Sequence, residues 1–147
     1  GCTKVGDCGA TGWCDFPDDK CGAGAVGTCK PRPAGCSDNP VAVCGCDGKA
    51  YELGCHTASG VDKNVDGSQC TAPMGSFSCG DKFCQTGLFY CRLDVSDVGN
   101  EPSTYHCNPA PAACSEKASC ACVKGEPCGD ICKETADGGV MLTCPGG

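Results

Sequence analysis

The sequence predicts a small disulfide-rich α+β protein that contains two tandem modules and about ten disulfide bonds. Cysteine supplies 20 of the 147 residues, whereas the chain has one Trp and only 5% aromatic residues. This cysteine fraction lies far above the roughly 8–10% that is typical of a disulfide scaffold, so cross-links replace much of the apolar core. Because disulfides persist in oxidising compartments, we expect the protein to be extracellular or at the cell surface.

The composition also limits the classes of partner. The formal net charge is −7 and the basic residues form no cluster, so the chain has no electrostatic route to the phosphates of nucleic acid. No segment approaches the roughly 18 consecutive apolar residues that a membrane-spanning helix needs. We therefore expect neither nucleic-acid binding nor membrane insertion.

The cysteines divide evenly between two halves of the chain, which indicates a tandem duplication. The pattern C-x-P-x-P-A-x-C occurs at 29–36 and again at 107–114. We expect units at 1–70 and 79–147, each with a cysteine-rich N-terminal extension. A linker is expected at 71–78, because its Pro and Gly residues disfavour regular structure.

Regular secondary structure is expected to be sparse. The apolar and β-branched segments 41–43 and 140–143 are the best strand candidates. Residues 52–59 are the best helix candidate in the first half, with Gly60 as the residue that ends the helix. The counterpart in the second half is 130–136.

One motif in the first half identifies a family resemblance. The pattern V-C-G-x-D-G-x-x-Y ends at Tyr51, and the spacing C-x7-C-x10-C runs from Cys36 to Cys55. These features resemble a Kazal-type domain in its bacterial, cysteine-rich form, a fold found in many secreted serine-protease inhibitors. The resemblance covers 29–70 and, in weaker form, 107–144. It implies two Kazal-like modules, each with a short helix and a small antiparallel sheet.

The resemblance also implies disulfide pairings. By analogy with the family, the expected bonds are Cys36–Cys55, Cys44–Cys70, Cys29–Cys46, Cys114–Cys132, Cys120–Cys144 and Cys107–Cys122. The sequence leaves open the connectivity of Cys2, Cys8, Cys14, Cys21, Cys79, Cys84, Cys91 and Cys128. Among the alternatives we favour Cys2–Cys14 with Cys8–Cys21, and Cys79–Cys91 with Cys84–Cys128.

A protease-binding loop is implied at Ser37, Asp38, Asn39 and Pro40, with Asp38 at the primary specificity position. Only proteases with basic pockets accept a carboxylate there, because burying an unpaired charge costs several kcal/mol. The asparagine that supports this loop in the family is replaced by Leu53. The corresponding loop of the second half has five residues between its cysteines instead of seven. We therefore rank inhibition of a serine protease as the alternative function.

The function that we expect first is a secreted, disulfide-stapled structural or adhesive protein, such as a subunit of an extracellular filament. Head-to-tail association would hold the Pro-Gly-Gly tail at 145–147, and such contacts build fibres when they do not close.

No cofactor, metal or catalytic group is predicted. The chain contains no C-x-x-C pair, and an even, pairable number of cysteines argues against a free catalytic thiolate. The motif G-x-S-x-G is also absent, so we do not expect an enzyme. Residues 62–67 copy the opening of a calcium-binding loop, but Pro73 occupies the position of its bidentate glutamate. A turn is the better interpretation of this segment.

Overall fold

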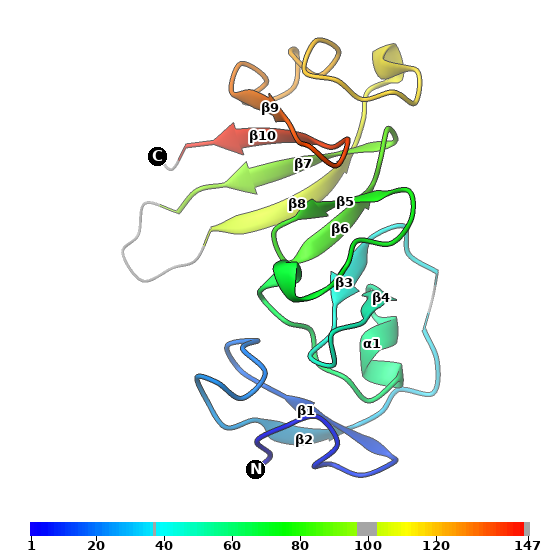
Figure 1. The fold of residues 1–147 in the computed structure, drawn as a ribbon, viewed down its shortest axis with the longest axis vertical. Coiled ribbons are helices and arrows are strands. Elements are labelled where there is room, and N and C mark those ends of the chain that lie inside the picture. Colours follow the sequence, from blue (N-terminus) through cyan, green and yellow to red (C-terminus); the bar gives the residue numbers. More distant parts are fainter. Residues whose placement is uncertain (37, 97–102, 146–147) are drawn as a thin grey trace. The chain divides into compact units, whose positions relative to one another are not determined.

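The computed structural model describes residues 1–36, 38–96 and 103–145 (Figure 1). The chain divides into two compact units, Gly1–Thr71 and Ala72–Gly147, which we call unit 1 and unit 2. The division falls inside the expected linker, 71–78. That segment also contains the start of a strand, β5, which begins at Ser76. All 20 cysteines are paired, in ten disulfides that each close within one unit.

Unit 1 begins with a two-stranded antiparallel hairpin. Strand β1 (Gly12–Asp15) pairs with β2 (Thr28–Pro31), and the register places Cys14 directly opposite Cys29. Alternate residues of β1 are buried, as expected for a strand with one face on a core. Every residue of β2 is exposed, so the hairpin contributes little apolar core of its own.

The second part of unit 1 contains another antiparallel hairpin and one short helix. Strand β3 (Ala42–Cys44) pairs with β4 (Ala50–Glu52), and helix α1 (Cys55–Ala58) follows. The helix is shorter than the expected segment, 52–59, because β4 occupies residues up to Glu52 and Gly54 then adopts a φ of 91°. A single turn of 3₁₀-helix, η1 (Gly67–Gln69), precedes the last cysteine of the unit.

Unit 2 consists of strands and turns. Its strands are β5 (Ser76–Cys79), β6 (Lys82–Gln85), β7 (Phe89–Asp94), β8 (Thr104–Pro109), β9 (Cys132–Glu134) and β10 (Val140–Cys144), with a 3₁₀ turn η2 (Ala112–Cys114). Strands β5 and β6 form an antiparallel hairpin. The other four lie in one sheet, in the order β8-β7-β10-β9. In this sheet β10 runs parallel to β7, whereas the pairs β7–β8 and β9–β10 are antiparallel.

The helix expected at 130–136 is not present. Residues 132–134 form β9, which pairs antiparallel with β10. A tight turn joins the two strands, because the N–H of Thr135 donates to the carbonyl of Gly139 and Gly138 adopts a φ of 88°. The turn residues that were expected to end a helix instead close a hairpin.

Half or more of the buried residues in each of two clusters are cysteines. The clusters are Cys2, Cys14 and Phe16 in unit 1, and Phe77, Cys79, Cys84 and Cys91 in unit 2. A third cluster, also in unit 2, is more conventional and contains Tyr90, Cys114, Val123, Val140 and Leu142. Sulfur thus fills interior space that larger apolar side chains occupy in most domains.

The structure contains four of the ten expected pairings: Cys2–Cys14, Cys36–Cys55, Cys44–Cys70 and Cys79–Cys91. The other six expectations are wrong, namely Cys29–Cys46, Cys8–Cys21, Cys107–Cys122, Cys84–Cys128, Cys114–Cys132 and Cys120–Cys144. The observed bonds in their place are Cys8–Cys29, Cys21–Cys46, Cys84–Cys107, Cys114–Cys122, Cys120–Cys132 and Cys128–Cys144.

The β1–β2 hairpin explains why two of the expected pairings in unit 1 are wrong. Pairing of β1 with β2 keeps Cys29 beside the N-terminal cysteines, and it bonds to Cys8. Cys46 lies beyond β3, and its N–H donates to the carbonyl of Asp62. Cys21, in the loop that follows β1, then supplies the partner of Cys46.

The absence of the helix expected at 130–136 explains why the expected pairings of Cys132 and Cys144 are wrong. The implied pairings need Cys132 on a helix, as Cys55 is in unit 1, but Cys132 is the first residue of β9. Val140, Leu142 and Cys144 alternate with less buried residues along β10, so Cys144 faces the interior. Its Sγ lies 4.0 Å from the carbonyl oxygen of Pro127, and the adjacent Cys128 is its partner.

Both units share a four-cysteine arrangement that we call the double-disulfide module. In each, the first cysteine bonds the third and the second bonds the fourth. The members are Cys2, Cys8, Cys14 and Cys29 in unit 1, and Cys79, Cys84, Cys91 and Cys107 in unit 2. In both units the strand register places the third cysteine directly opposite the fourth. Cys14 on β1 lies opposite Cys29 on β2, and Cys91 on β7 lies opposite Cys107 on β8.

Replacement of Gly27 with alanine is expected to destabilise unit 1 by roughly 1–3 kcal/mol, the usual cost of overpacking. A Cβ at this position would lie 2.5 Å from the Sγ of Cys14 and 3.0 Å from the Sγ of Cys2. Gly35→Ala is the matched control, because its Cβ would meet nothing within 4 Å. Denaturant unfolding followed by the fluorescence of Trp13, the single Trp, measures both variants. Equal midpoints for the two variants would contradict the packing argument.

Candidate functional site

The expected protease-binding loop lies between two disulfide-anchored elements of unit 1. Cys36 is exposed and bonds to Cys55 in α1. Asp38 and Pro40 are exposed and Asn39 is half-buried, whereas Ser37 lies outside the described residues. The loop continues into β3, whose last residue is the fully buried Cys44.

The loop is stiffened locally by Asn39. Its side-chain Oδ1 accepts a hydrogen bond from the N–H of Val41 at 2.9 Å, which forms an Asx-type turn just before β3. Leu53 donates a hydrogen bond from its backbone N–H to the carbonyl of Val41 at 2.9 Å. The support of the loop from behind is therefore a main-chain hydrogen bond to its C-terminal end.

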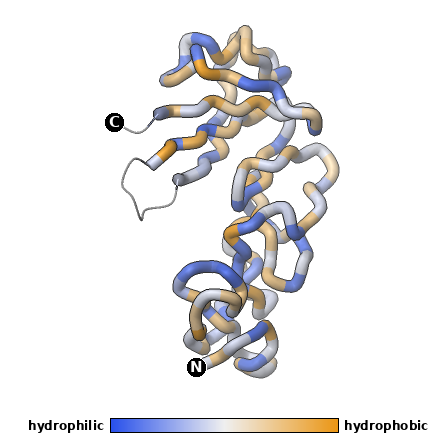
Figure 2. Tube along the Cα trace, turned by 60° about the vertical axis from the view of Figure 1, so that its left-hand side comes forward, coloured by the Kyte–Doolittle hydropathy of each residue, from blue (hydrophilic) through white to orange (hydrophobic). Residues whose placement is uncertain are grey.

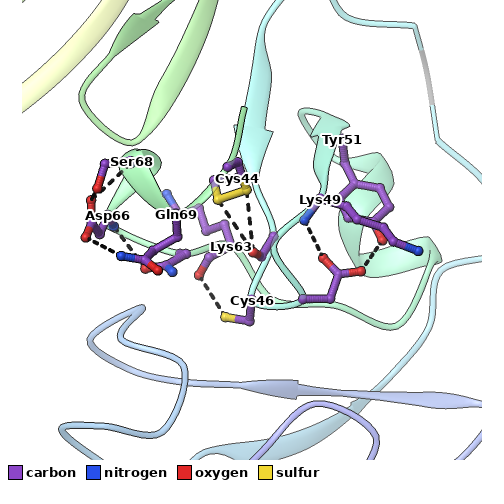
Figure 3. The surroundings of a disulfide bond; sticks show 12 residues. Cys44, Cys46, Lys49, Tyr51, Lys63, Asp66, Ser68 and Gln69 are labelled. Carbon is purple, nitrogen blue, oxygen red and sulfur yellow. Dashed lines mark hydrogen bonds between the residues drawn. A yellow bond between two sulfur atoms is a disulfide. The ribbon is translucent and has the colours of Figure 1, made fainter. Parts of the chain in front are cut away.

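The Cys44–Cys70 disulfide anchors the base of this region (Figure 3). On one side of it, the carboxylate of Asp47 accepts from the N–H of Lys49 and from the hydroxyl of Tyr51. Burial, together with the hydrogen bond and the charge of Asp47, raises the pKa of Tyr51 to about 12. These contacts hold the turn between β3 and β4.

The segment that copies a calcium-binding loop uses its side chains for other purposes. Asn64 Oδ1 accepts from the N–H of Asp66, and Asp66 in turn caps η1 by accepting from the N–H and hydroxyl of Ser68 (Figure 3). The side-chain amide of Gln69 also donates to Asp66. The hydrogen bonds of Asp66 lower the pKa of its carboxyl. Asp62 faces a different part of the unit, so these groups do not converge on one point.

Asp62 instead belongs to a cluster of three carboxylates with Asp15 and Asp19. One oxygen from each lies within 4.8 Å of the others. Asp62 is 3% exposed, and its two oxygens accept from the N–H groups of Phe16 and Lys63, each at 2.8 Å. Because Phe16 follows β1, this buried carboxylate joins the first and second parts of unit 1.

Cations flank the cluster on two sides. The ammonium group of Lys30 forms an ion pair with Asp15 and lies 5.8 Å from the ring centroid of Trp13. The ammonium group of Lys63 lies 3.8 Å from a carboxylate oxygen of Asp19. Both ion pairs are partly exposed, and such pairs typically contribute 1 kcal/mol or less.

Burial raises the pKa of Asp62 to about 6. The negative charges of Asp19 and Asp15 add to this effect, whereas the hydrogen bonds from Phe16 and Lys63 oppose it. The Asp62 carboxyl is therefore expected to exchange a proton with solvent in a mildly acidic range, where its pKa lies.

Sequence reasoning did not identify this cluster. The sequence singles out Asp62 only as the first position of a calcium-loop pattern, and Asp15 and Asp19 belong to no motif. The three come together because the Cys21–Cys46 disulfide and the hydrogen bond from Val65 to the carbonyl of Asp19 draw the two parts of unit 1 together.

In the described part of the chain, no helix has the length and apolar character to cross a bilayer. Hydrophobic and hydrophilic residues alternate along the trace, without a long hydrophobic run (Figure 2). Ten disulfides indicate an oxidising environment for the folded protein. Comparison of the chain with protein-family models, with curated proteins and with solved structures finds no match.

Proposed function

We propose that this chain is a structural protein of the extracellular space or cell surface, whose copies associate head to tail. The observation that carries the proposal is the closure of every disulfide within its own unit. Each unit is cross-linked independently of the other, so neither needs a large apolar core to stay folded. This is the construction expected of a durable building block.

Exposed apolar side chains on each unit support the self-association. Val26 is 63% exposed in unit 1, and Ile131 is 48% exposed in unit 2. A contact between the surface around Val26 of one copy and the surface around Ile131 of the next is heterologous, and such contacts can extend into filaments. The acidic net charge of −7 opposes this association at low ionic strength and is screened by salt.

The test is the mass of the particle as a function of concentration. Light scattering across a wide concentration range in physiological salt is expected to show growth beyond the monomer, with filaments visible by electron microscopy. The double variant Val26→Ser with Ile131→Ser is expected to reduce this growth, whereas Thr28→Ser, at an exposed polar site, is the control. A monomer at every concentration would contradict the proposal.

A second candidate function is inhibition of a serine protease through the loop that contains Asp38. The observation that favours it is the exposure of Asp38 between Cys36 and Asn39, in a loop tied to α1 and to a buried strand. A loop ordered before binding loses little conformational entropy when it docks.

Conversion of specificity tests this candidate. The wild-type protein is expected to inhibit a protease that cleaves after acidic residues, and Asp38→Arg is expected to inhibit trypsin instead, both in the nanomolar range. Asp130→Arg, at an exposed acidic site in unit 2, controls for charge. Simple cleavage of the Asp38→Arg loop, without inhibition, would reject the candidate.

A further inference from the structure

The two disulfides of each double-disulfide module lie side by side. In unit 1, the Sγ atoms of Cys2, Cys8 and Cys29 all lie within 4.8 Å of one another. These sulfurs come from two different bonds, Cys2–Cys14 and Cys8–Cys29. A thiolate freed at Cys8 would therefore lie next to the sulfur of Cys2, which is the arrangement that thiol–disulfide exchange requires.

Unit 2 repeats this geometry. The Sγ atoms of Cys79, Cys84 and Cys107 lie within the same 4.8 Å of one another, and they come from Cys79–Cys91 and Cys84–Cys107. The juxtaposition is thus a property of the duplicated module rather than of one loop.

The hairpins place the remaining cysteines for the alternative pairing. Cys14 on β1 and Cys29 on β2 are opposite each other in the register. Opposite residues in an antiparallel pair have Cα atoms about 4.5–5.5 Å apart, within the roughly 4.4–6.8 Å that a disulfide spans. The register therefore favours a Cys14–Cys29 bond in the folded hairpin, and the proximity of the Cys2 and Cys8 sulfurs favours the complementary Cys2–Cys8 bond.

Access from solvent differs between the two units. In unit 1, Cys29 is exposed and Cys8 is half-buried, whereas Cys2 and Cys14 are each 2% exposed. In unit 2, Cys79, Cys84 and Cys91 are completely buried and Cys107 is half-buried. Cys29 is therefore the most exposed member of the module in unit 1, and the module of unit 2 contains no equally exposed cysteine.

We propose that the double-disulfide module of unit 1 is a thiol-exchange site, at which a low-molecular-mass thiol converts Cys2–Cys14 and Cys8–Cys29 into Cys2–Cys8 and Cys14–Cys29. The incoming thiolate attacks the Sγ of Cys29, the Cys8–Cys29 bond breaks, and Cys8 leaves as a thiolate. The thiolate of Cys8 attacks the Sγ of Cys2, forms Cys2–Cys8 and releases the thiolate of Cys14. That thiolate attacks the Sγ of Cys29 in the mixed disulfide, forms Cys14–Cys29 and releases the external thiol.

The external thiol is regenerated, so the sequence involves no net oxidation or reduction. The number of disulfides in unit 1 stays the same, but their positions change. In the new pairing the N-terminal segment closes on itself through Cys2–Cys8 and is no longer bonded to β1. The core of Cys2, Cys14 and Phe16 then loses its covalent tie to the N-terminus.

The first experiment exposes the folded wild-type protein to 2-mercaptoethanol without denaturant, blocks thiols with iodoacetamide at intervals, and maps disulfides by mass spectrometry. Cys2–Cys8 and Cys14–Cys29 are expected to form roughly tenfold faster than any change in unit 2, because Cys29 is exposed. Reduction of Cys8–Cys29 with Cys2–Cys14 retained, a reaction that begins in unit 2, or an unchanged map would each overturn the proposal.

A second experiment tests the proximity of the Cys8 and Cys2 sulfurs alone. It uses no external thiol, so the access of such a thiol to Cys29 does not affect the result. Cys29→Ser leaves a thiol at Cys8, and exchange with Cys2–Cys14 is expected to move iodoacetamide labelling to Cys14. Cys36→Ser is the matched control, since Cys36 and Cys55 belong to no group of three neighbouring sulfurs among the described residues. Its label is expected to stay on Cys55. A label that stays on Cys8 in Cys29→Ser, with the other nine disulfides formed, would overturn the proposal.

Discussion

Replacement of Phe77 with alanine is expected to destabilise unit 2 by about 3–5 kcal/mol. Phe77 is fully buried, and it packs in a cluster with Cys79, Cys84 and Cys91. A Cβ on Gly139 would lie 2.1 Å from its ring, so the backbone of the turn between β9 and β10 lies directly against the ring. Removal of the ring leaves a cavity whose walls are two disulfides and a tight turn. These walls relax little, which places the cost in the upper part of the range for core substitutions.

Hydrogen exchange of the amides in β7 and β10 measures this effect, because their protection follows the free energy of opening of unit 2. Leu88→Ala is the matched control, since Leu88 is 42% exposed and lies in the same unit. The control is expected to change the free energy of opening by less than about 0.5 kcal/mol. A loss below about 1 kcal/mol for Phe77→Ala would show that the disulfides alone maintain the unit.

The stability of unit 1 is expected to fall by about 2 kcal/mol between pH 4 and pH 7 through Asp62 alone. The pKa of Asp62 is about 6 in the folded protein, above its ordinary value of 3.8, chiefly because the carboxyl is buried. A raised pKa means that the folded state binds the proton more tightly than the unfolded state. This contribution is fully present below the unfolded pKa and is lost as the pH rises through about 6.

His56 acts in the opposite direction. Burial and the charge of Lys63 lower its pKa, and its Nδ1 is buried without a hydrogen-bond partner among the described residues. Its contribution is present above the unfolded pKa of 6.5 and is lost as the pH falls through the lower folded value. The measured pH profile of unit 1 is the sum of the two effects.

Comparison of the wild type with Asp62→Asn isolates the carboxyl, because His56 contributes equally to both proteins. Unfolding followed by the fluorescence of Trp13 reports on unit 1. The wild type is expected to gain about 2 kcal/mol relative to the variant when the pH is lowered from 7 to 4. A difference that is independent of pH would mean that Asp62 titrates in the folded protein as it does in the unfolded chain.

The sequence predicted the features of the fold that depend on local patterns. The strands at 41–43 and 140–143 correspond to β3 (Ala42–Cys44) and β10 (Val140–Cys144). Both are apolar segments bounded by Gly, Cys or Pro, so local preference and burial agree.

The pairing of the cysteines depended on contacts that the sequence does not contain. Cys29 was assigned to Cys46 because the family motif places them together. The β1–β2 hairpin, which lies largely outside that motif, keeps Cys29 beside Cys8 instead. The pairing expected by analogy is present where the expected elements also form, as for Cys36–Cys55, where Cys55 lies on the short helix α1.

The candidate sites also combine features that follow from local sequence with features that depend on long-range contacts. The exposure of Asp38 followed from its place in a loop, whereas the cluster of Asp15, Asp19 and Asp62 arises from segments far apart in the chain. The raised pKa of Asp62 is a consequence of burial, which no pattern of carboxylates in the sequence encodes.

A disulfide map of the unreduced protein, alkylated in acid before digestion, tests the central claim most directly. The account predicts that Cys8 bonds to Cys29 and Cys84 to Cys107 as equivalent links, with every bond closed inside Gly1–Thr71 or Ala72–Gly147. Any bond that joins the two units, or a substantial fraction of alkylated cysteine, would contradict it.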